Sequence, residues 1–310
     1  MATLKVAILG ASGMLGSMVL DYLSRDSRHQ IIATVRSEKM IARLRSVYPN
    51  VEWRLLDAES GDVGAARRAL EGAAWVINAV GKIKPYIRDD NPVEVEAAIK
   101  VNSGFPYVLS HALAGDGARI VQIATDCVFS GKDGKYLESS KHDPLDVYGK
   151  TKSLGECALP AFMHLRCSII GPEPKGYLSL LDWFRRQPKG ADLKGYSNHF
   201  WNGVTTLHFA KLCGGIIHGG LFRPGVQHVV PGDSISKADL LECFKAEYRR
   251  TDISIQHVEV VPVVDRTLKT AREQENRALW AAAGHDRIPT VREMVAEMAR
   301  FDFHMEGALN

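Results

Sequence analysis

The chain has 310 residues, 45% hydrophobic and 24% charged, which is the composition of an ordinary globular protein with one large or two modest domains. Its 39 basic and 36 acidic residues are spread along the chain, and the net charge of +3 argues against a nucleic-acid or membrane-surface partner. No signal-peptide pattern precedes the first strand-like run, and no apolar stretch is long enough to cross a bilayer, so we expect a cytoplasmic protein.

The cysteines support the same expectation. They are odd in number and lack the paired spacing of a metal site, so we predict small buried side chains in a reducing compartment, and no metal centre. The five residues are Cys127, Cys157, Cys167, Cys213 and Cys243.

The N-terminal region combines a strand, a glycine-rich turn and a helix. Residues 5–9 (KVAIL) form a strand-like run, glycines follow with the spacing Gly-x-x-Gly-x-x-Gly, and apolar residues then recur with a helical period. Such glycines let the turn close and let the backbone approach a pyrophosphate, which the helix amides would face. We predict a dinucleotide site formed by Gly10, Ser12, Gly13, Met14, Leu15 and Gly16.

The residues after the next two strands indicate which dinucleotide is bound. A second strand over residues 30–35 ends before Arg36, where an acidic side chain would select a ribose 2′-hydroxyl and a basic one accommodates a 2′-phosphate. Arg36 therefore favours NADP over NAD. A third strand over residues 51–56 ends before Asp57, which we expect to bind the adenine amino group.

The fourth strand ends in small residues. It is predicted over residues 74–81, after a helix over residues 65–70. Small residues at the carboxyl end of a strand leave room for a ligand, which binds at that edge in open α/β sheets. We expect Ala79, Val80 and Gly81 to line the cofactor site.

The fifth strand ends in a polar pair. A long helix is predicted over residues 92–114, with Asn102 near its middle, and the strand follows over residues 118–124. Thr125 and Asp126 come directly after it, at the edge where a ligand would bind. A role in chemistry is therefore favoured over a simple strand cap.

Tyr148 and Lys152 are four residues apart in what reads as the first turn of a helix. At this spacing both side chains leave the same face. A nearby ammonium favours the phenolate and lowers the pKa of the tyrosine, so the pair could donate or accept a proton. Taken alone, such a pair also arises often by chance.

A sixth strand is predicted over residues 162–170, and the composition changes after Gly171, where proline and glycine become frequent. We predict an α/β fold: a Rossmann-type, doubly wound parallel sheet with a smaller C-terminal α/β lobe that binds substrate. Residues 1–171, completed by about 204–230, would form the NADP-binding domain, and residues 172–310 mainly the substrate-binding lobe. Later elements are expected as helices over residues 205–217, 236–248 and 289–301 and strands over residues 225–230 and 255–261.

Together these motifs resemble the extended short-chain dehydrogenase/reductase family, and within it the dTDP-4-dehydrorhamnose reductase branch of sugar-nucleotide 4-keto reductases. The matching residues are Gly10, Gly13 and Gly16; Asp57; Asn78 to Gly81; Val101 and Asn102; Thr125, Asp126, Val128 and Phe129; Tyr148, Lys152, Gly155 and Glu156; Leu165, Arg166 and Gly171; and Gly203 to Thr205.

The resemblance implies NADPH-dependent reduction of the 4-keto group of a nucleotide-activated deoxysugar. It implies Tyr148 as the general acid, Lys152 as the residue that lowers the phenol pKa and binds the nicotinamide ribose, and Thr125 as a hydroxyl donor to the substrate oxygen. Asp126 would lie beside this donor. Asn102 would anchor a proton-relay water.

The chain also departs from the branch. Cys127 and Ala124 stand where the branch typically has Tyr and Ser, and residues 198–202 replace its usual Asp-Gln. The candidate substrate contacts are Lys82, Trp201 and Asn202, together with Arg166, Arg223 and Arg266, whose guanidinium groups suit a diphosphate but fit a structural ion pair equally well.

Two other functions fit the same resemblance. One is a nucleotide-sugar epimerase or 4,6-dehydratase, although the dehydratase needs an acidic pair and Cys127 follows Asp126 here. The other is a non-catalytic NADP-binding regulatory subunit like the β subunit of methionine adenosyltransferase. The resemblance adds a homodimer as one expected assembly.

Overall fold

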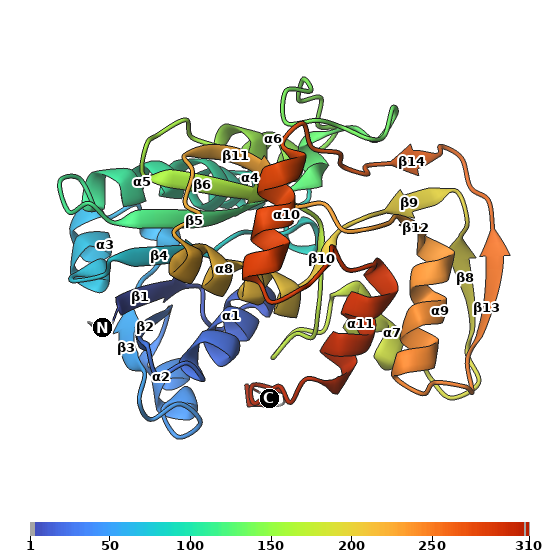
Figure 1. Ribbon diagram of the computed structural model, residues 1–310, viewed down its shortest axis with the longest axis horizontal. Helices are drawn as coiled ribbons and strands as arrows, with labels where there is room; N and C mark the ends of the chain where they lie inside the picture. The colour runs from blue at the N-terminus through green and yellow to red at the C-terminus, as the bar shows by residue number, and fades with distance from the viewer. Residues whose placement is uncertain (1–3, 307, 310) are drawn as a thin grey trace.

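The computed structural model describes residues 4–306 and 308–309 (Figure 1). The expectation that no signal peptide precedes the first strand concerns residues 1–3, which lie outside this range. A seven-stranded parallel sheet has the strand order β11-β6-β5-β4-β1-β2-β3, as predicted for a Rossmann-type fold. Its strands are β1 (Leu4–Leu9), β2 (His29–Val35), β3 (Glu52–Leu55), β4 (Trp75–Asn78), β5 (Arg119–Ala124), β6 (Phe162–Arg166) and β11 (Gly225–His228).

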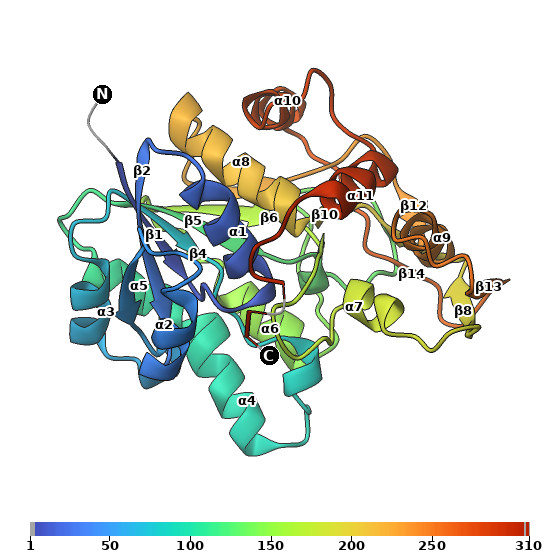
Figure 2. The ribbon, with the colours of Figure 1, turned by 90° about the horizontal axis from the view of Figure 1, so that it is seen from below.

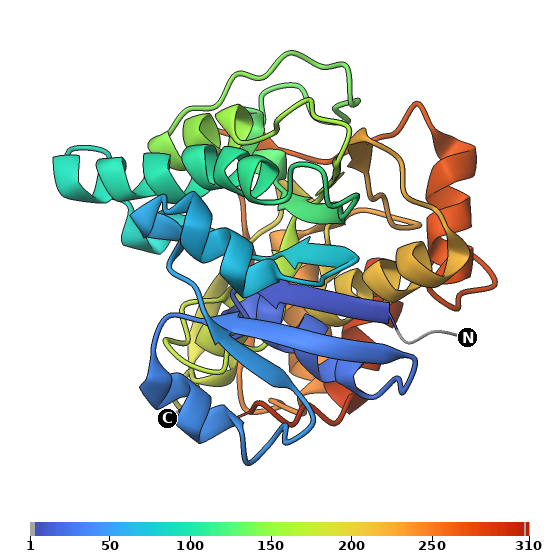
Figure 3. The same cartoon turned by 90° about the vertical axis from the view of Figure 1, so that its left-hand side faces the viewer.

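Both faces of the sheet are buried under helices. Alternate residues of β1 pack into different cores, with Val6 and Ile8 in one and Ala7 and Leu9 in the other. Figures 2 and 3 show the two layers of helices on opposite sides of the sheet. One layer contains α1 (Met14–Ser24) and α8 (Thr206–Gly219), with α10 (Glu273–Ala282) against α8, and the other contains α3 (Val63–Leu70) and α5 (Phe105–Ala112).

The helix predicted over residues 92–114 is interrupted. It consists of α4 (Pro92–Ala98), a π-helical segment (Ile99–Gly104) and α5. The side chain of Asn102 leaves this segment and bonds to the chain after β4: Oδ1 accepts from the Lys82 amide at 2.8 Å, and Nδ2 donates to the Lys82 carbonyl at 2.9 Å. A π-helical turn often marks a functional site, and here it ties Asn102 to the carboxyl edge of the sheet.

The smaller lobe lies beside the carboxyl edge, at the right of Figure 1. In its three-stranded sheet, β9 (His199–Trp201) pairs antiparallel with β12 (Ile235–Ser236) and parallel with β14 (Val264–Asp265). The lobe also contains a parallel pair and three helices: β8 (Asp192–Tyr196), β13 (Ser254–Val258), α7 (Leu180–Arg185), α9 (Lys237–Glu247) and α11 (Val291–Arg300).

The strand predicted over residues 162–170 is two strands. β6 ends at Arg166, and the chain then leaves the main sheet, so that β7 (Ile169–Ile170) pairs with β10 (Val204–Thr205) instead. The prediction also missed α7, α10, α2 (Glu38–Leu44) and the shortest strands.

All five cysteines are free thiols; four are buried and Cys127 is half-buried, as expected for small core side chains. Among the described residues, no helix combines the length and the apolar character needed to cross a membrane.

Candidate active site

Helix α6 (Val147–Leu154) carries Tyr148 in its first turn and Lys152 one turn later, as predicted. Asp146 caps the helix by accepting a hydrogen bond from the Gly149 amide at 2.8 Å. The same carboxylate forms an ion pair with Lys84 at 2.6 Å. This cap fixes where the helix begins and therefore where the phenol lies.

Two glycines allow α6 to lie directly against the carboxyl edge of the sheet. A Cβ atom on Gly149 would lie 2.3 Å from the carbonyl oxygen of Cys127, and one on Gly155 would lie 2.0 Å from the carbonyl oxygen of Asn102. Neither carbonyl has room for a side chain opposite it. The glycines therefore bring the Tyr148 helix onto the chain that follows β5 and onto the π-helical segment.

Thr125 and Asp126 lie at the end of β5, beside α6. The Thr125 hydroxyl oxygen accepts from the Cys127 amide at 3.1 Å, and the hydroxyl donates to Asp126 Oδ1 at 3.2 Å. The Thr125 side chain also lies close enough to the phenol of Tyr148 to lower its pKa. The three polar groups predicted from two separate segments thus meet at one edge of the sheet.

Tyr148 does not have the lowered pKa that was expected from the neighbouring Lys152. The pKa of Tyr148 is raised, because burial disfavours the phenolate, as does the neighbouring Cys127, whereas the polar side chain of Thr125 opposes this shift. Lys152 Nζ instead donates to the Ile123 carbonyl at 2.9 Å, and burial lowers the pKa of Lys152 to about 8. Tyr148 is therefore a protonated phenol at neutral pH, which is the form that a general acid needs.

The glycine turn joins β1 to α1. Gly10 has a φ of +74°, in the left-handed region that glycine favours, and its carbonyl accepts from the Gly13 amide at 2.9 Å. A Cβ atom on Gly16 would lie 2.2 Å from the Gly10 carbonyl oxygen. No side chain caps the first turn of α1, so its amides remain available to a phosphate.

The fourth strand leads past this turn. Val80 contacts Gly10, where a Cβ atom would lie 3.1 Å from Val80 Cγ2, and the Val80 amide donates to Asn78 Oδ1 at 3.2 Å. Ala79 and Val80 are half-buried, and Gly81 is exposed. These residues line the sheet edge between the glycine turn and α6, where we predicted a cofactor.

Arg36 and Asp57 are exposed at the ends of β2 and β3, as predicted. One carboxylate oxygen of Asp57 accepts from the Glu59 amide at 3.0 Å. Lys175, which the sequence analysis did not identify, lies beside Arg36. Burial and the charge of Arg36 lower the pKa of Lys175. Its Nζ lies 3.9 Å from the sulfur of Met40. Lys175 comes from the segment after β7, far along the chain.

The structure corrects the prediction for Arg166, which does not face a substrate. Its side chain is only 1% exposed and forms an ion pair with the carboxylate of Glu156. Its two terminal nitrogens each lie 2.8 Å from a histidine ring nitrogen, one on His228 and the other on His142. Arg166 is a core cation whose guanidinium is fully engaged within the protein.

Two further predicted substrate contacts are structural. Asn202 donates to the Leu268 carbonyl at 2.7 Å and accepts from the Leu268 amide at 2.9 Å, so its amide group holds the chain after β14. Trp201 is only 4% exposed, and its indole donates to Ser168 Oγ at 2.9 Å. Both residues therefore fix the packing of the smaller lobe.

The remaining two arginines differ in position. Arg223 lies before β11, at the edge of the sheet opposite the site, and forms an ion pair with Glu275 at 2.6 Å. Arg266 lies directly after β14, and its Nε donates to the Phe129 carbonyl at 2.9 Å. Its charge acts on Cys127 and Asp146, so Arg266 does lie beside α6.

The profile of the RmlD substrate binding domain matches residues 4–170, which is more than half of the chain. The chain belongs to this family. The RmlD match covers strands β1 to β6 of the large sheet, with the glycine turn and α6, and it also includes β7; β11 of the large sheet lies beyond it. It ends where the smaller lobe begins.

The chain is similar both to dTDP-4-dehydrorhamnose reductases and to methionine adenosyltransferase 2 beta subunits. The dTDP-4-dehydrorhamnose reductase of Mycolicibacterium smegmatis is 26% identical over 190 residues, covering 61% of this chain and 48% of the relative. Methionine adenosyltransferase 2 subunit beta of Xenopus tropicalis is 33% identical over 158 residues, covering 50% of this chain and 42% of the relative. The chain spans about half the length of these curated relatives.

The RmlD-type fold extends over nearly the whole chain. The crystal structure of dTDP-4-dehydrorhamnose reductase from Bacillus anthracis in complex with NADP superimposes with a TM-score of 0.71 at 17% identity. The superposition covers 96% of this chain and 99% of that one. At this identity the likeness establishes a shared fold, including the smaller lobe.

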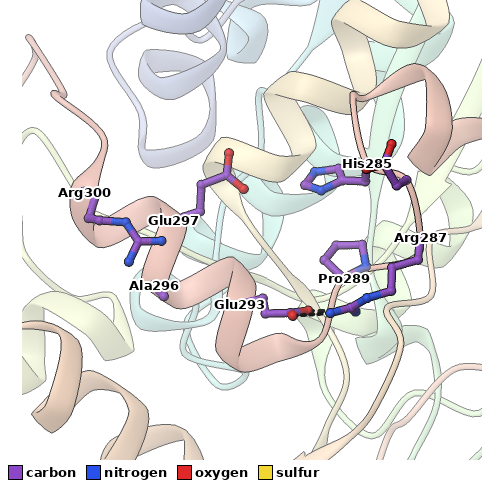
Figure 4. A pocket seen from close by; sticks show the side chains of 8 residues that line it. His285, Arg287, Pro289, Glu293, Ala296, Glu297 and Arg300 are labelled. Atoms are coloured by element: carbon purple, nitrogen blue, oxygen red, sulfur yellow. Dashed lines mark hydrogen bonds and ion pairs between the residues drawn. The ribbon is translucent and has the colours of Figure 1, made fainter.

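A hollow of about 450 Å³ is lined by α11 and the loop before it (Figure 4). Its lining includes Glu297 of α11 and His285 of the preceding loop, and His208 of α8 lies 3.0 Å from Glu297.

The side chains of His208, His285 and Glu297 could hold a metal ion, as could those of Asp26, His29 and His218. However, the ammonium of Lys211 lies 2.8 Å from Glu297 and 3.3 Å from His285, and already provides a cation. The prediction of no metal centre stays a prediction.

Proposed function

We propose that the protein is an NADPH-dependent reductase that acts on the 4-keto group of a nucleotide-activated deoxysugar. The observation that carries this proposal is the meeting of Thr125, Tyr148 and Lys152 at the carboxyl edge, beside a glycine turn with free helix amides. The RmlD family and the reductases among its relatives support the same chemistry.

The residues present fit this cofactor. The turn from Gly10 to Gly16 would hold the pyrophosphate, Arg36 with Lys175 the 2′-phosphate, and Asp57 the adenine. The remaining predicted contacts, Ala79, Val80 and Gly81, would lie along the nicotinamide. We also propose that residues 1–171, with about 204–230, form this NADP-binding part and that residues 172–310 mainly bind substrate; the pairing of β11 with β6 supports this division.

When bound, NADPH supplies a hydride to the carbonyl carbon of the sugar. Tyr148 donates its phenolic proton to the carbonyl oxygen as negative charge develops there, and the Thr125 hydroxyl donates a second hydrogen bond to this oxygen. In doing so Thr125 would release its bond to Asp126. The ammonium of Lys152 would bind the nicotinamide ribose.

Asn102 would anchor the water that returns a proton to this phenolate. Its side-chain amide donates to the Lys82 carbonyl and, at 3.1 Å, to Thr151 Oγ1, so both of its hydrogens are used. A relay water would therefore donate to an oxygen of Asn102 and not accept from its nitrogen. Lys82 is held at the edge of the sheet by the same contacts and is available to the substrate through its side chain.

The 2′-phosphate contact predicts the coenzyme preference. Arg36→Ala should raise the Kd for NADPH by about 10- to 100-fold, because an exposed hydrogen-bonded charge pair is lost, and should change the Kd for NADH less than twofold. Fluorescence titration with both coenzymes measures this. Arg45→Ala, which removes an exposed arginine just after α2, is the matched control. A wild-type protein that prefers NADH would contradict the assignment of Arg36.

The buried ammonium predicts a pH dependence of cofactor binding. Lys152 is charged below its pKa of about 8 and loses this charge as the pH rises. The affinity for NADPH should therefore fall as the pH rises through about 8, and this inflection should vanish in Lys152→Met. Titrations at a series of pH values test it, with Lys150→Met, an exposed lysine on the same helix, as the control that keeps the inflection. An inflection that survives in Lys152→Met would assign it to another group.

The second candidate function is a non-catalytic NADP-binding regulatory subunit. The observation that favours it is the 33% identity with a methionine adenosyltransferase 2 subunit beta over 158 residues. An epimerase, the other alternative, would be expected to recycle a bound cofactor without net consumption. We further propose a cytoplasmic location, which the free thiols support, and a homodimer, which light scattering would test.

One experiment separates these functions. The purified chain is titrated with NADPH and NADH, and the absorbance of the dihydronicotinamide is then followed as 4-keto-6-deoxy sugar nucleotides are added one at a time. The reductase predicts tight binding of NADPH and its stoichiometric consumption with at least one substrate. Tight binding with no consumption across the panel would transfer the support to the regulatory subunit if the sugar nucleotides are recovered unchanged, and to the epimerase if they are recovered as epimers.

A further inference from the structure

Two histidines and a carboxylate meet at the amino edge of the main sheet, opposite the edge that carries the candidate active site. His29 is the first residue of β2, His218 lies in the last turn of α8, and Asp26 lies in the turn between α1 and β2 (Figure 2). The His29 amide donates to the Asp26 carbonyl at 3.1 Å, which fixes this turn. The two imidazole rings stack, with centroids 4.7 Å apart and an angle of 3° between their planes.

The imidazole of His29 is buried without a hydrogen-bond partner. Its side chain is 0% exposed, and within residues 4–306 and 308–309 neither ring nitrogen makes a hydrogen bond. Its Nε2 atom lies 3.8 Å from Asp26 Oδ2, which is too long for a hydrogen bond. Buried polar atoms are nearly always paired, because an unpaired one has lost its bonds to water. The nitrogen is therefore free to bind a group that also binds Asp26.

The distances between the three side chains suit one small divalent cation. Asp26 Oδ2 lies 3.8 Å from His29 Nε2 and 3.6 Å from His218 Nε2, and the three ligand atoms all lie within 4.8 Å of one another. Two ligands of a tetrahedral zinc ion, each bound at about 2.0–2.1 Å, are separated by about 3.4 Å. The Asp26 oxygen is thus close to this geometry with either histidine. Asp26 and His218 are partly exposed, so an ion can enter from solvent.

Two contacts must change when an ion binds. The rings are parallel, so their nitrogen lone pairs do not converge, and the His218 ring has to turn toward Asp26. Arg28 Nη2 lies 2.6 Å from Asp26 Oδ2 and competes for the same oxygen. Both groups can move, because the Arg28 side chain is largely exposed and His218 lies at the end of a helix. A helix C-terminus also favours a nearby cation.

We propose that Asp26, His29 and His218 bind a divalent transition-metal ion of the zinc type. Imidazole and carboxylate groups are zinc ligands, and three protein ligands leave a fourth position for water. The ion would tie the end of α8 to the turn before β2 and would stabilise the folded chain without taking part in hydride transfer. The proposal departs from the absence of a metal centre predicted from the cysteines, because no cysteine is a ligand here and His218 is distant in sequence from the other two ligands.

Calorimetric titration with Zn²⁺ tests the proposal on the full, untagged chain, from which metal has been removed with a chelator. We expect His218→Gln and His29→Gln to weaken Zn²⁺ binding by about 10-fold or more, because each variant removes one of three ligands. Arg28→Gln should tighten binding, because it frees Asp26 Oδ2. His111→Gln removes an exposed histidine of α5, is the matched control and should bind as wild type does.

Thermal unfolding gives a second readout. Zn²⁺ at about 100 times its Kd should raise the Tm of wild type and of His111→Gln by about 2 °C or more, and should leave the Tm of His218→Gln nearly unchanged. His218 is partly exposed, so this variant carries the test if His29→Gln does not fold.

Three results would overturn the proposal. Wild type that binds no Zn²⁺ would do so, as would equal binding by wild type and His218→Gln. The third is binding that is lost in His285→Gln and kept in His218→Gln, because the ion would then belong to the set of His208, His285 and Glu297. The readouts are binding and unfolding, so the result does not depend on the reductase proposal or on its sugar substrate.

Discussion

Tyr148→Phe is expected to lower kcat by about 10²- to 10⁴-fold, because it removes the group that protonates the carbonyl oxygen. The phenyl ring keeps the packing of α6, so the affinity for NADPH should change by less than a few-fold. The pKa of Tyr148 is raised by burial, which keeps the proton on the wild-type phenol throughout the neutral range. Steady-state loss of dihydronicotinamide absorbance measures kcat, and fluorescence titration measures binding.

Tyr107→Phe is the matched control. This tyrosine is exposed on α5, and its hydroxyl lies 3.4 Å from the Leu154 carbonyl, so removing the hydroxyl should leave turnover unchanged. If Tyr148→Phe kept the wild-type kcat, a different residue would have to supply the proton. Equal losses in both variants would point to a defect of α6 packing.

Gly149→Ala is expected to destabilise the protein by about 1–3 kcal/mol, although alanine favours a helix more than glycine does. The new Cβ atom would lie 2.3 Å from the Cys127 carbonyl oxygen and 2.7 Å from Pro144 Cβ, so α6 must move away from the chain that follows β5. Such a movement separates Tyr148 from Thr125, and turnover should be lost with stability. Urea denaturation with the linear extrapolation measures the free energy of unfolding.

Gly64→Ala provides the opposite expectation on a helix that does not touch the site. Gly64 is exposed on α3, and its nearest neighbours are the side-chain atoms Asp62 Oδ1 at 3.2 Å and Arg68 Nη1 at 3.4 Å, which can move. This variant should gain about 0.5–1 kcal/mol through the higher helix propensity of alanine. Stabilisation by Gly149→Ala as well would contradict the close contact between α6 and the chain that follows β5.

The main sheet could be predicted because each of its strands is a short apolar run that ends at a turn or a polar residue. β1 and β5 have this form and were placed to within one residue. The apolar run after residue 162 continues through Ile170, although the chain leaves the sheet after Arg166, so the pattern could not show the break. β7, β10 and β12 have two residues each, which is too short for any periodicity.

The candidate site was predictable where topology brings separate motifs together. Thr125 ends a parallel strand and Tyr148 opens the next helix, and carboxyl ends of parallel strands share one edge. Lys175 could not be found in this way, because it comes from a segment of the later chain that only the tertiary structure brings beside Arg36. Arg166 was wrongly predicted because a strand-end arginine suits a diphosphate or a core ion pair equally, and its partner His228 is distant in sequence.

In the proposed reaction a hydride passes from the bound coenzyme to a sugar carbon beside Tyr148. The most direct test supplies NADPH deuterated at the transferred position, together with the 4-keto-6-deoxy sugar nucleotide panel, and analyses the sugar by mass spectrometry and NMR. The proposal predicts one deuterium per turnover at C4 of the product and none in the Tyr148→Phe reaction beyond its residual rate. Tight binding of the labelled coenzyme with no deuterium in any sugar would contradict it.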